Sequence, residues 1–137
     1  MRISLAIAIL SLSATSAMAF DVQYGKMTGL VGTLVDRKGV DCCTNGKEKT
    51  VTFPALQLDQ PINVASTNAQ DPDPDEMPEQ GVRVMQLVLK DKDQWKTYKQ
   101  SKGKRVRVEC TLFHSATGHH LTPVLCDVIG IGTPDSL

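Results

Sequence analysis

Residues 82–114 read VRVMQLVLKDKDQWKTYKQSKGKRVRVECTLFH, and this stretch decides the fold because its character changes twice. Residues 82–90 and 105–114 are runs rich in valine and leucine, as in strands with a buried face. Between these runs, Asp91 or Asp93 can cap the start of a helix, and Gly103 can end it. The stretch therefore predicts a strand, one short helix and a second strand.

Two further strands are predicted on the N-terminal side of this stretch. Residues 27–36, MTGLVGTLVD, alternate along their length, and the internal glycines indicate a sharp bend or a close backbone approach. Residues 37–49 predict a polar turn region around the pair Asn45-Gly46. Residues 50–64 follow as a strand that two prolines interrupt, which favours an edge strand or a bent one.

A fifth strand is predicted at residues 121–131, LTPVLCDVIGI. Five strands, a glycine-rich first strand and a helix between the third and fourth strands predict a mainly β fold: a five-stranded OB-like Greek-key barrel with one short helix. A five-stranded sheet with the helix packed on one face is the alternative.

The first residues have the features of a secretory signal peptide. Residues 1–19 contain Arg2, an apolar run too short to span a bilayer and the small residues Ala17-Met18-Ala19. We expect cleavage before Phe20, a single domain over residues 20–137, a periplasmic or secreted location in a bacterium, and no stable insertion into a membrane.

The overall charge is balanced, with 15 basic and 15 acidic residues, so the sequence has no general attraction to nucleic acid. Aromatic residues make up 4% of the chain, which also disfavours nucleic-acid binding by base stacking. The charges are locally segregated, however. Residues 66–81, named here the acidic loop, are polar and rich in proline and include Asp73, Asp75 and Glu76. They predict a solvated surface loop, with a binding surface as the alternative.

Four cysteines in an exported chain predict a disulfide framework. If the apolar faces of the last two strands coincide, Leu112 lies opposite Val124 and Cys110 opposite Cys126, which favours a cross-strand disulfide. In the alternatives, Cys42 and Cys43 each cross-link to this hairpin, or Cys110 and Cys126 are buried free thiols. Adjacent cysteines lack the C-x-x-C spacing of a redox or zinc site.

Residues 114–120, HSATGHH, are named here the histidine loop. His114 and His119 or His120 could approach one ion, but zinc requires a third protein ligand and the nearest acid, Asp127, lies well along the next strand. No motif of a catalytic nucleophile surrounds the loop. We therefore predict a structural turn without metal or cofactor, in which the pair Thr117-Gly118 supplies a residue that tolerates a positive φ.

The blocks LVGTLV, LQLDQPINV, VMQLVL and GKRVRVECTLFHSATGHHLTPVLCDV together resemble a family of small exported bacterial OB-like domains of unknown function. Asn63 and Cys110 depart from residues common in that family, so the resemblance implies no disulfide pairing. It implies an OB-like barrel and export, and no activity. The positions that carry the hallmark are Gly103, Lys104, Thr111, Leu112, Phe113, His114, Thr117, Gly118, His119, His120, Thr122, Pro123 and Val124.

Three functional classes follow. A non-enzymatic binding module of the bacterial cell envelope, with a protein or envelope component as its partner, best suits a small exported barrel without a catalytic motif. A periplasmic inhibitor or immunity protein that neutralises a toxin or an envelope enzyme, with the acidic loop as a wedge, is the alternative. A metal-dependent enzyme that uses the histidine loop is the third class. The candidate binding residues are His114, Thr117, Gly118, His119, His120, Asp73, Asp75 and Glu76.

Overall fold

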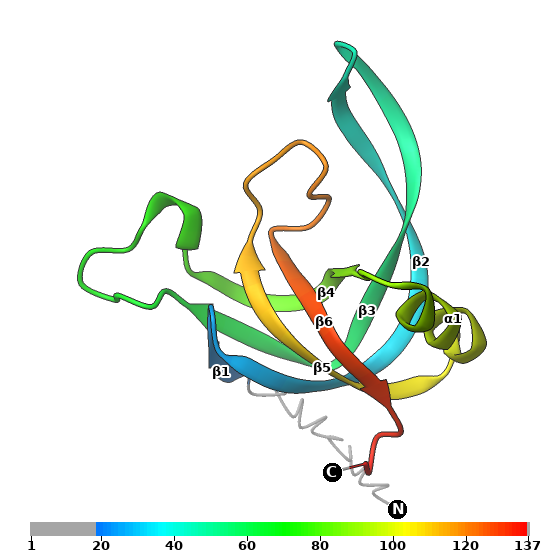
Figure 1. The fold of residues 1–137 in the computed structure, drawn as a ribbon. Coiled ribbons are helices and arrows are strands. Elements are labelled where there is room, and N and C mark those ends of the chain that lie inside the picture. Colours follow the sequence, from blue (N-terminus) through cyan, green and yellow to red (C-terminus); the bar gives the residue numbers. More distant parts are fainter. Residues whose placement is uncertain (1–18, 137) are drawn as a thin grey trace, which may run out of the picture.

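The computed structural model describes residues 19–136 of the chain. It contains six strands, a short 3-10 helix before β4 and one α-helix after it (Figure 1). In chain order these are β1 (Phe20–Gln23), β2 (Met27–Thr44), β3 (Lys47–Ala65), η1 (Pro74–Glu76), β4 (Glu79–Val88), α1 (Lys92–Ser101), β5 (Arg105–His114) and β6 (Val124–Gly132). Residues 1–18, which hold most of the predicted signal peptide, lie outside the described residues.

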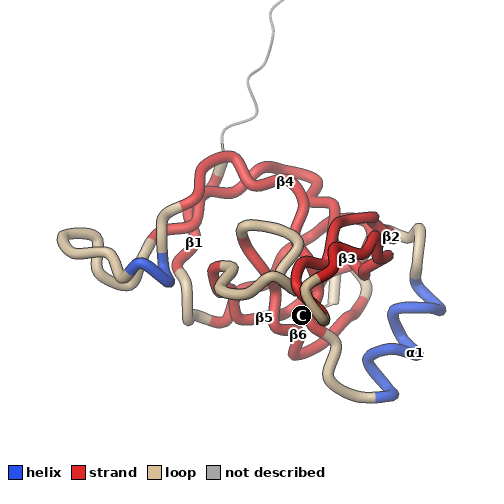
Figure 2. Tube along the Cα trace, turned by 90° about the horizontal axis from the view of Figure 1, so that it is seen from above, coloured by secondary structure: helices blue, strands red, loops and turns tan. Residues whose placement is uncertain are grey.

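Five of the strands close into a barrel. The sheet has the order β1-β3-β2-β5-β6-β4, and the pairing of β3 with β4 closes it into the ring seen in Figure 2. Neighbouring barrel strands are antiparallel except β4 and β6, which are parallel. The prediction of a mainly β, five-stranded barrel with one short helix between its third and fourth strands is therefore confirmed. The additional strand β1, which pairs in parallel with the end of β3, was not predicted.

Two long strands shape the barrel. The first half of β2 pairs with β5 and its second half with β3, and Gly32 lies where the two ladders overlap. A Cβ atom on Gly32 would lie 2.3 Å from the carbonyl oxygen of Gln57, so the expected close backbone approach is present. Since β3 has paired neighbours on both sides, it is not an edge strand, but its ladder with β4 shifts register between Gln57 and Ile62, the span that contains Pro61.

Beyond the barrel, β2 and β3 continue as a two-stranded ribbon that projects from one end (Figure 1). The ribbon ends in a turn at Asn45 and Gly46, whose φ angles are 59° and 71°. The predicted turn at this pair is confirmed, but the polar turn region over residues 37–49 is wrong because the strands extend through it. Side chains of the outer ribbon are largely exposed, so no apolar alternation marks these strands in the sequence.

The core is formed by inward-facing side chains of the barrel strands, and Tyr98 of α1 packs against it. Asp91 caps the helix, accepting a hydrogen bond of 2.8 Å from the backbone N–H of Gln94. The hydroxyl of Tyr98 donates to the carbonyl oxygen of Val35 and to Asp36, at 2.9 and 2.6 Å. These bonds fasten α1 to the outside of β2. In the described part of the chain, no helix is long and apolar enough to cross a membrane.

The hairpin of β5 and β6 carries the Cys110–Cys126 disulfide, with a Cα–Cα distance of 5.5 Å. The predicted register is nevertheless wrong by two residues, because Leu112 pairs with Cys126 and Cys110 with Val128. The offset is already present at His114 and Val124, next to the connecting loop, so the alternation pattern alone does not fix this register, and a bulge between Glu109 and Cys110 moves it by one further residue. The arrangement in which Cys42 and Cys43 each cross-link to this hairpin is also wrong. Cys42 is itself disulfide-bonded, and the side chain of Cys43 lies outside the described residues.

Candidate functional site

The histidine loop connects β5 to β6 and is closed by its own backbone. The N–H of Ser115 donates to the carbonyl oxygen of Pro123 at 2.9 Å. His120 stabilises the turn from inside, because its Nδ1 accepts hydrogen bonds from the N–H groups of Ala116 and Thr117 at 2.9 and 3.3 Å. His120 therefore supports the backbone of the loop.

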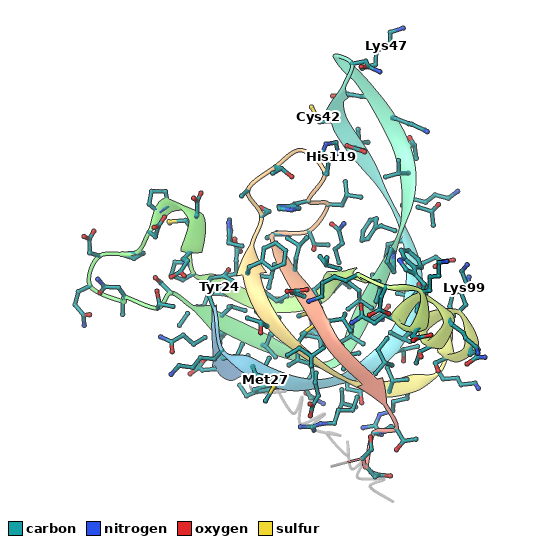
Figure 3. All side chains as sticks on the ribbon, in the orientation of Figure 1. Tyr24, Met27, Cys42, Lys47, Lys99 and His119 are labelled. Carbon is teal, nitrogen blue, oxygen red and sulfur yellow. A yellow bond between two sulfur atoms is a disulfide. The ribbon has the colours of Figure 1, made fainter. Side chains whose placement is uncertain are left out.

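The other two histidines contact different parts of the barrel. Nε2 of His114 lies 2.9 Å from a carboxylate oxygen of Glu79, at the start of β4. Nδ1 of His119 lies 2.6 Å from Asp41 on β2, and Figure 3 shows His119 beside the ribbon that carries Cys42 and apart from Tyr24. The described residues contain no group of three or more His, Cys, Asp or Glu side chains that could hold a metal ion. Each of the three imidazoles thus has its own partner: a carboxylate for His114, another carboxylate for His119, and backbone N–H groups for His120.

A glycine is required at position 118 because a side chain there would clash with a neighbouring segment, and not because of its φ angle. Its φ is not in the left-handed region, so the predicted positive φ at Thr117-Gly118 is wrong. A Cβ atom on Gly118 would lie 2.8 Å from the carbonyl oxygen of Cys42, and the N–H of Cys42 donates to the carbonyl oxygen of Gly118 at 3.2 Å. The histidine loop therefore packs directly on the backbone of β2.

Gln86 of β4 holds the return segment of the same connection. The side-chain oxygen of Gln86 accepts a hydrogen bond from the backbone N–H of Leu121 at 2.7 Å. The backbone N–H of Gln86 donates to the hydroxyl of Thr122 at 2.8 Å. Together with the contacts to Asp41 and Cys42, these bonds fix the loop to two strands far apart in the sequence. The loop is thus held by these bonds in a defined position beside the end of β5.

The acidic loop is ordered by its own carboxylates. Glu76 accepts hydrogen bonds from the N–H and the hydroxyl of Thr67, and these bonds hold the pKa of Glu76 below its usual range although partial burial opposes them. Asp73 caps η1, since its side chain accepts from the N–H of Asp75 at 2.9 Å. The predicted solvated loop is therefore a constrained segment, exposed at most of its residues.

Tyr24 connects the acidic loop to the barrel. Its hydroxyl donates to the carbonyl oxygen of Met77 at 3.0 Å, and its ring meets that of His114 edge to face, with centroids 6.1 Å apart. Burial, and then the negative charges of Glu79 and Glu76, raise the pKa of Tyr24 far above its ordinary value. Tyr24 is consequently a neutral hydrogen-bond donor that holds the two segments in place.

These contacts leave a hollow of about 480 Å³ between the acidic loop and the outer face of β5, named here the acidic hollow. Four of the eight predicted binding residues line it, whereas Thr117, Gly118, His119 and His120 do not. Four carboxylates and no lysine or arginine are among its described lining residues. Lys90, close by, forms an ion pair of 2.8 Å with Asp127. The lining residues are Tyr24, Gly25, Asp73, Asp75, Glu76, Thr111, Leu112, Phe113, His114, Ala116 and Asp127.

Sequence reasoning missed seven of these eleven residues as parts of a site, and the three with the most distinctive side chains are Tyr24, Phe113 and Asp127. Tyr24 follows a four-residue strand that is too short to give a clear alternation, although the pair Tyr24-Gly25 is a recognisable turn signal. Phe113 and Asp127 are at outward positions of β5 and β6, where a polar or aromatic residue has no distinguishing pattern. Only the approach of the acidic loop turns these positions into the wall of a hollow.

Comparison with known proteins gives one match. A sequence family described as a domain of unknown function (DUF4431) matches residues 84–131, which run from β4 through α1 and β5 into β6. The hallmark positions of the resemblance described above, residues 103–124, lie inside this range, whereas the blocks LVGTLV and LQLDQPINV lie outside it. The search of the curated proteins and the search of the solved structures each gave no match to this chain.

Proposed function

We propose that this protein is an exported, non-enzymatic binding module of the bacterial cell envelope, and that its acidic hollow binds a cationic group of a protein or envelope component. One observation carries the proposal. The acidic loop and His114, distant in sequence, line a single hollow with four carboxylates, of which Asp127 is paired with Lys90 and the three of the acidic loop have no lysine or arginine partner among the described residues. Carboxylates gathered in a recess attract a positive group more strongly than the same charges spread over a flat surface.

The contacts of the lining residues favour binding over catalysis. His114 is held by Glu79, and the Tyr24 hydroxyl is occupied by the carbonyl of Met77. Within the described residues, no histidine ring is hydrogen-bonded to a hydroxyl group, as a nucleophile and base pair requires. The half-buried ring of Phe113 adds an aromatic surface on which a bound cation can rest.

The barrel is further proposed to be of the OB type. If β2 is counted as the first barrel strand, β3, β4, β5 and β6 are the second to the fifth. Around the ring these strands follow the order 1-2-3-5-4, the fourth pairs with the first, and the third and fifth are parallel. The ribbon between its first two strands touches the loop between its last two, through Cys42 and Gly118. In OB barrels these two connections frequently border the binding surface.

A labelled hexalysine peptide is a suitable probe of the acidic hollow. Fluorescence anisotropy at low salt should detect binding to the mature chain, and the combined variant Asp73→Asn, Asp75→Asn, Glu76→Gln should weaken it about tenfold or more. The amides keep acceptor oxygens for the bonds that order the loop. The matched control is Glu48→Gln, Asp93→Asn, Asp135→Asn, which removes three exposed carboxylates elsewhere. Equal weakening by both variants contradicts a localised site.

An inhibitor or immunity protein is the second candidate, favoured by the projection of the acidic loop from the barrel in Figures 1 and 2. A wedge of this kind inserts its tip into the partner, whereas the acidic hollow receives a group from the partner. Asp71 is exposed in the same loop and does not line the hollow. Once a protein partner is identified, Asp71→Lys should weaken its binding if the loop is a wedge and leave it nearly unchanged if the hollow is the site.

A further inference from the structure

A second charged surface lies on α1, on the side of the barrel opposite the acidic loop. Lys92, Trp95, Lys96 and Lys99 are spaced so that they share one face of the helix, and together with Gln100 they line a shallow depression. All four side chains are exposed, and Trp95 is 40% accessible. This set is named here the basic face, and Figure 3 shows Lys99 on the outer side of the molecule.

The three lysines of the basic face have free charges. In the described part of the chain, the ion pairs of lysine and arginine are formed by Lys90, Lys102, Arg105 and Arg107, and none involves Lys92, Lys96 or Lys99. Two acids lie near the start of the helix: Asp91 precedes it as the N-cap, and Asp93 lies in its first turn. The charge of the face is therefore positive along most of the helix.

The helix is attached through its opposite side, so that the basic face is presented outward. Tyr98 is bonded to Val35 and Asp36, and the side chain of Gln94 donates to the carbonyl oxygen of Val128 at 2.9 Å. The ring of Trp95 meets Tyr98 edge to face, with centroids 6.1 Å apart, which fixes the indole while leaving it accessible. Figures 1 and 2 agree that α1 lies outside the ring of strands and away from the acidic loop.

We propose that the basic face binds the surface of a membrane that contains anionic phospholipids, with α1 lying along the headgroups and Trp95 at the interface. Lysine ammonium groups are point charges without the fixed fork of arginine, so an exposed row of them along a helix suits an extended anionic surface better than one small anion. An exposed indole beside lysines is the combination favoured at the boundary between water and lipid. Contact is peripheral, and the acidic loop, on the far side, is repelled from the same surface.

The sequence contains a single tryptophan, so its fluorescence reports on this face directly. Vesicles of phosphatidylcholine with about 30% phosphatidylglycerol should bind the mature chain at low salt and shift the emission of Trp95 to shorter wavelength, whereas phosphatidylcholine alone should not. Raising the salt to about 0.5 M should abolish binding. The combined variant Lys92→Gln, Lys96→Gln, Lys99→Gln should lower the partition coefficient roughly 100-fold, about a factor of five for each lysine.

The matched control removes three exposed lysines of the ribbon, through Lys38→Gln, Lys47→Gln and Lys49→Gln, and should change vesicle binding little. Trp95→Phe should still bind, with weaker partition, because it retains the lysines. Three results would overturn the proposal: equal binding to both kinds of vesicle, equal losses in the two triple variants, or binding to a soluble anionic polysaccharide without binding to the vesicles.

Discussion

Gly118 shows how one missing side chain allows two distant segments to meet. A Cβ atom there would lie 2.8 Å from a backbone oxygen of β2, which cannot rotate away as a side chain can. We expect Gly118→Ala to lower the free energy of unfolding by about 1–3 kcal/mol through overpacking, as measured by urea denaturation. Gly130→Ala is the control, because no atom lies within 4 Å of its added Cβ and its φ is not positive. Similar losses in both variants would contradict the packing explanation.

The histidines permit a second test at the scale of residues. Since His114, His119 and His120 contact Glu79, Asp41 and backbone N–H groups respectively, bound zinc would have to break one or more of these contacts. We expect zinc to leave the melting temperature of the mature chain nearly unchanged. A metal bound at a hundredfold excess over its dissociation constant would add about 2.7 kcal/mol to the free energy of unfolding. A shift of that size that His114→Ala with His119→Ala removes would support a metal site instead.

At the scale of elements, the acidic loop is predicted to loosen in acid. Hydrogen bonds from Thr67 to ionised Glu76 hold the pKa of Glu76 below its usual value of 4.5. A carboxyl group with a lowered pKa stabilises the folded chain above its unfolded pKa, and this contribution is lost as the pH falls through the folded pKa. The amide proton shift of Thr67, followed by NMR, should therefore titrate with a midpoint below 4.5. In Glu76→Gln the same titration should be absent.

The hairpin of β5 and β6 owes part of its stability to its disulfide. Cys110 and Cys126 are separated by 16 positions, and a cross-link of that length raises the free energy of unfolding by about 3 kcal/mol through the entropy of the unfolded chain. We expect Cys110→Ala with Cys126→Ala to lose at least this amount in urea denaturation, because both positions are also fully buried. A variant as stable as the parent would contradict the assignment.

The elements differ in how well the sequence predicts them. The predicted bounds of β5 match the observed ones because a buried residue recurs at every second position and faces the core; these residues are Val106, Val108, Cys110 and Leu112. The outer ribbon has no buried face, so its strands resemble a turn region. The acidic hollow could not be predicted, because it depends on how η1 packs beside β5, which no periodicity records. The chemistry of His114 and of the acidic loop residues marks them as candidate binding residues in the sequence. That they lie close together could not be predicted.

At the scale of the whole molecule, export remains a prediction of the sequence. If the signal peptide is removed as expected, the intact mass of the periplasmic protein should correspond to a chain that begins at Phe20. No cysteine is free among those the structure describes, and export predicts that all four cysteines are oxidised, so the non-reduced protein should not react with an alkylating agent. A mass that retains residues 1–19, or reactive thiols in the non-reduced protein, would contradict export or oxidation respectively.

The position of β6 also sets the order in which the molecule can be completed. This last strand lies between β5 and β4, two strands made earlier, and the barrel has no closing partner for either of them until β6 arrives. A chain that ends before Val124 keeps two open edges, so a partly synthesised or partly translocated chain cannot reach the native state. Closure of the barrel is thereby postponed until nearly the whole polypeptide is present, so that, if the chain is exported as proposed, it lacks its closed barrel for as long as its last strand has yet to emerge.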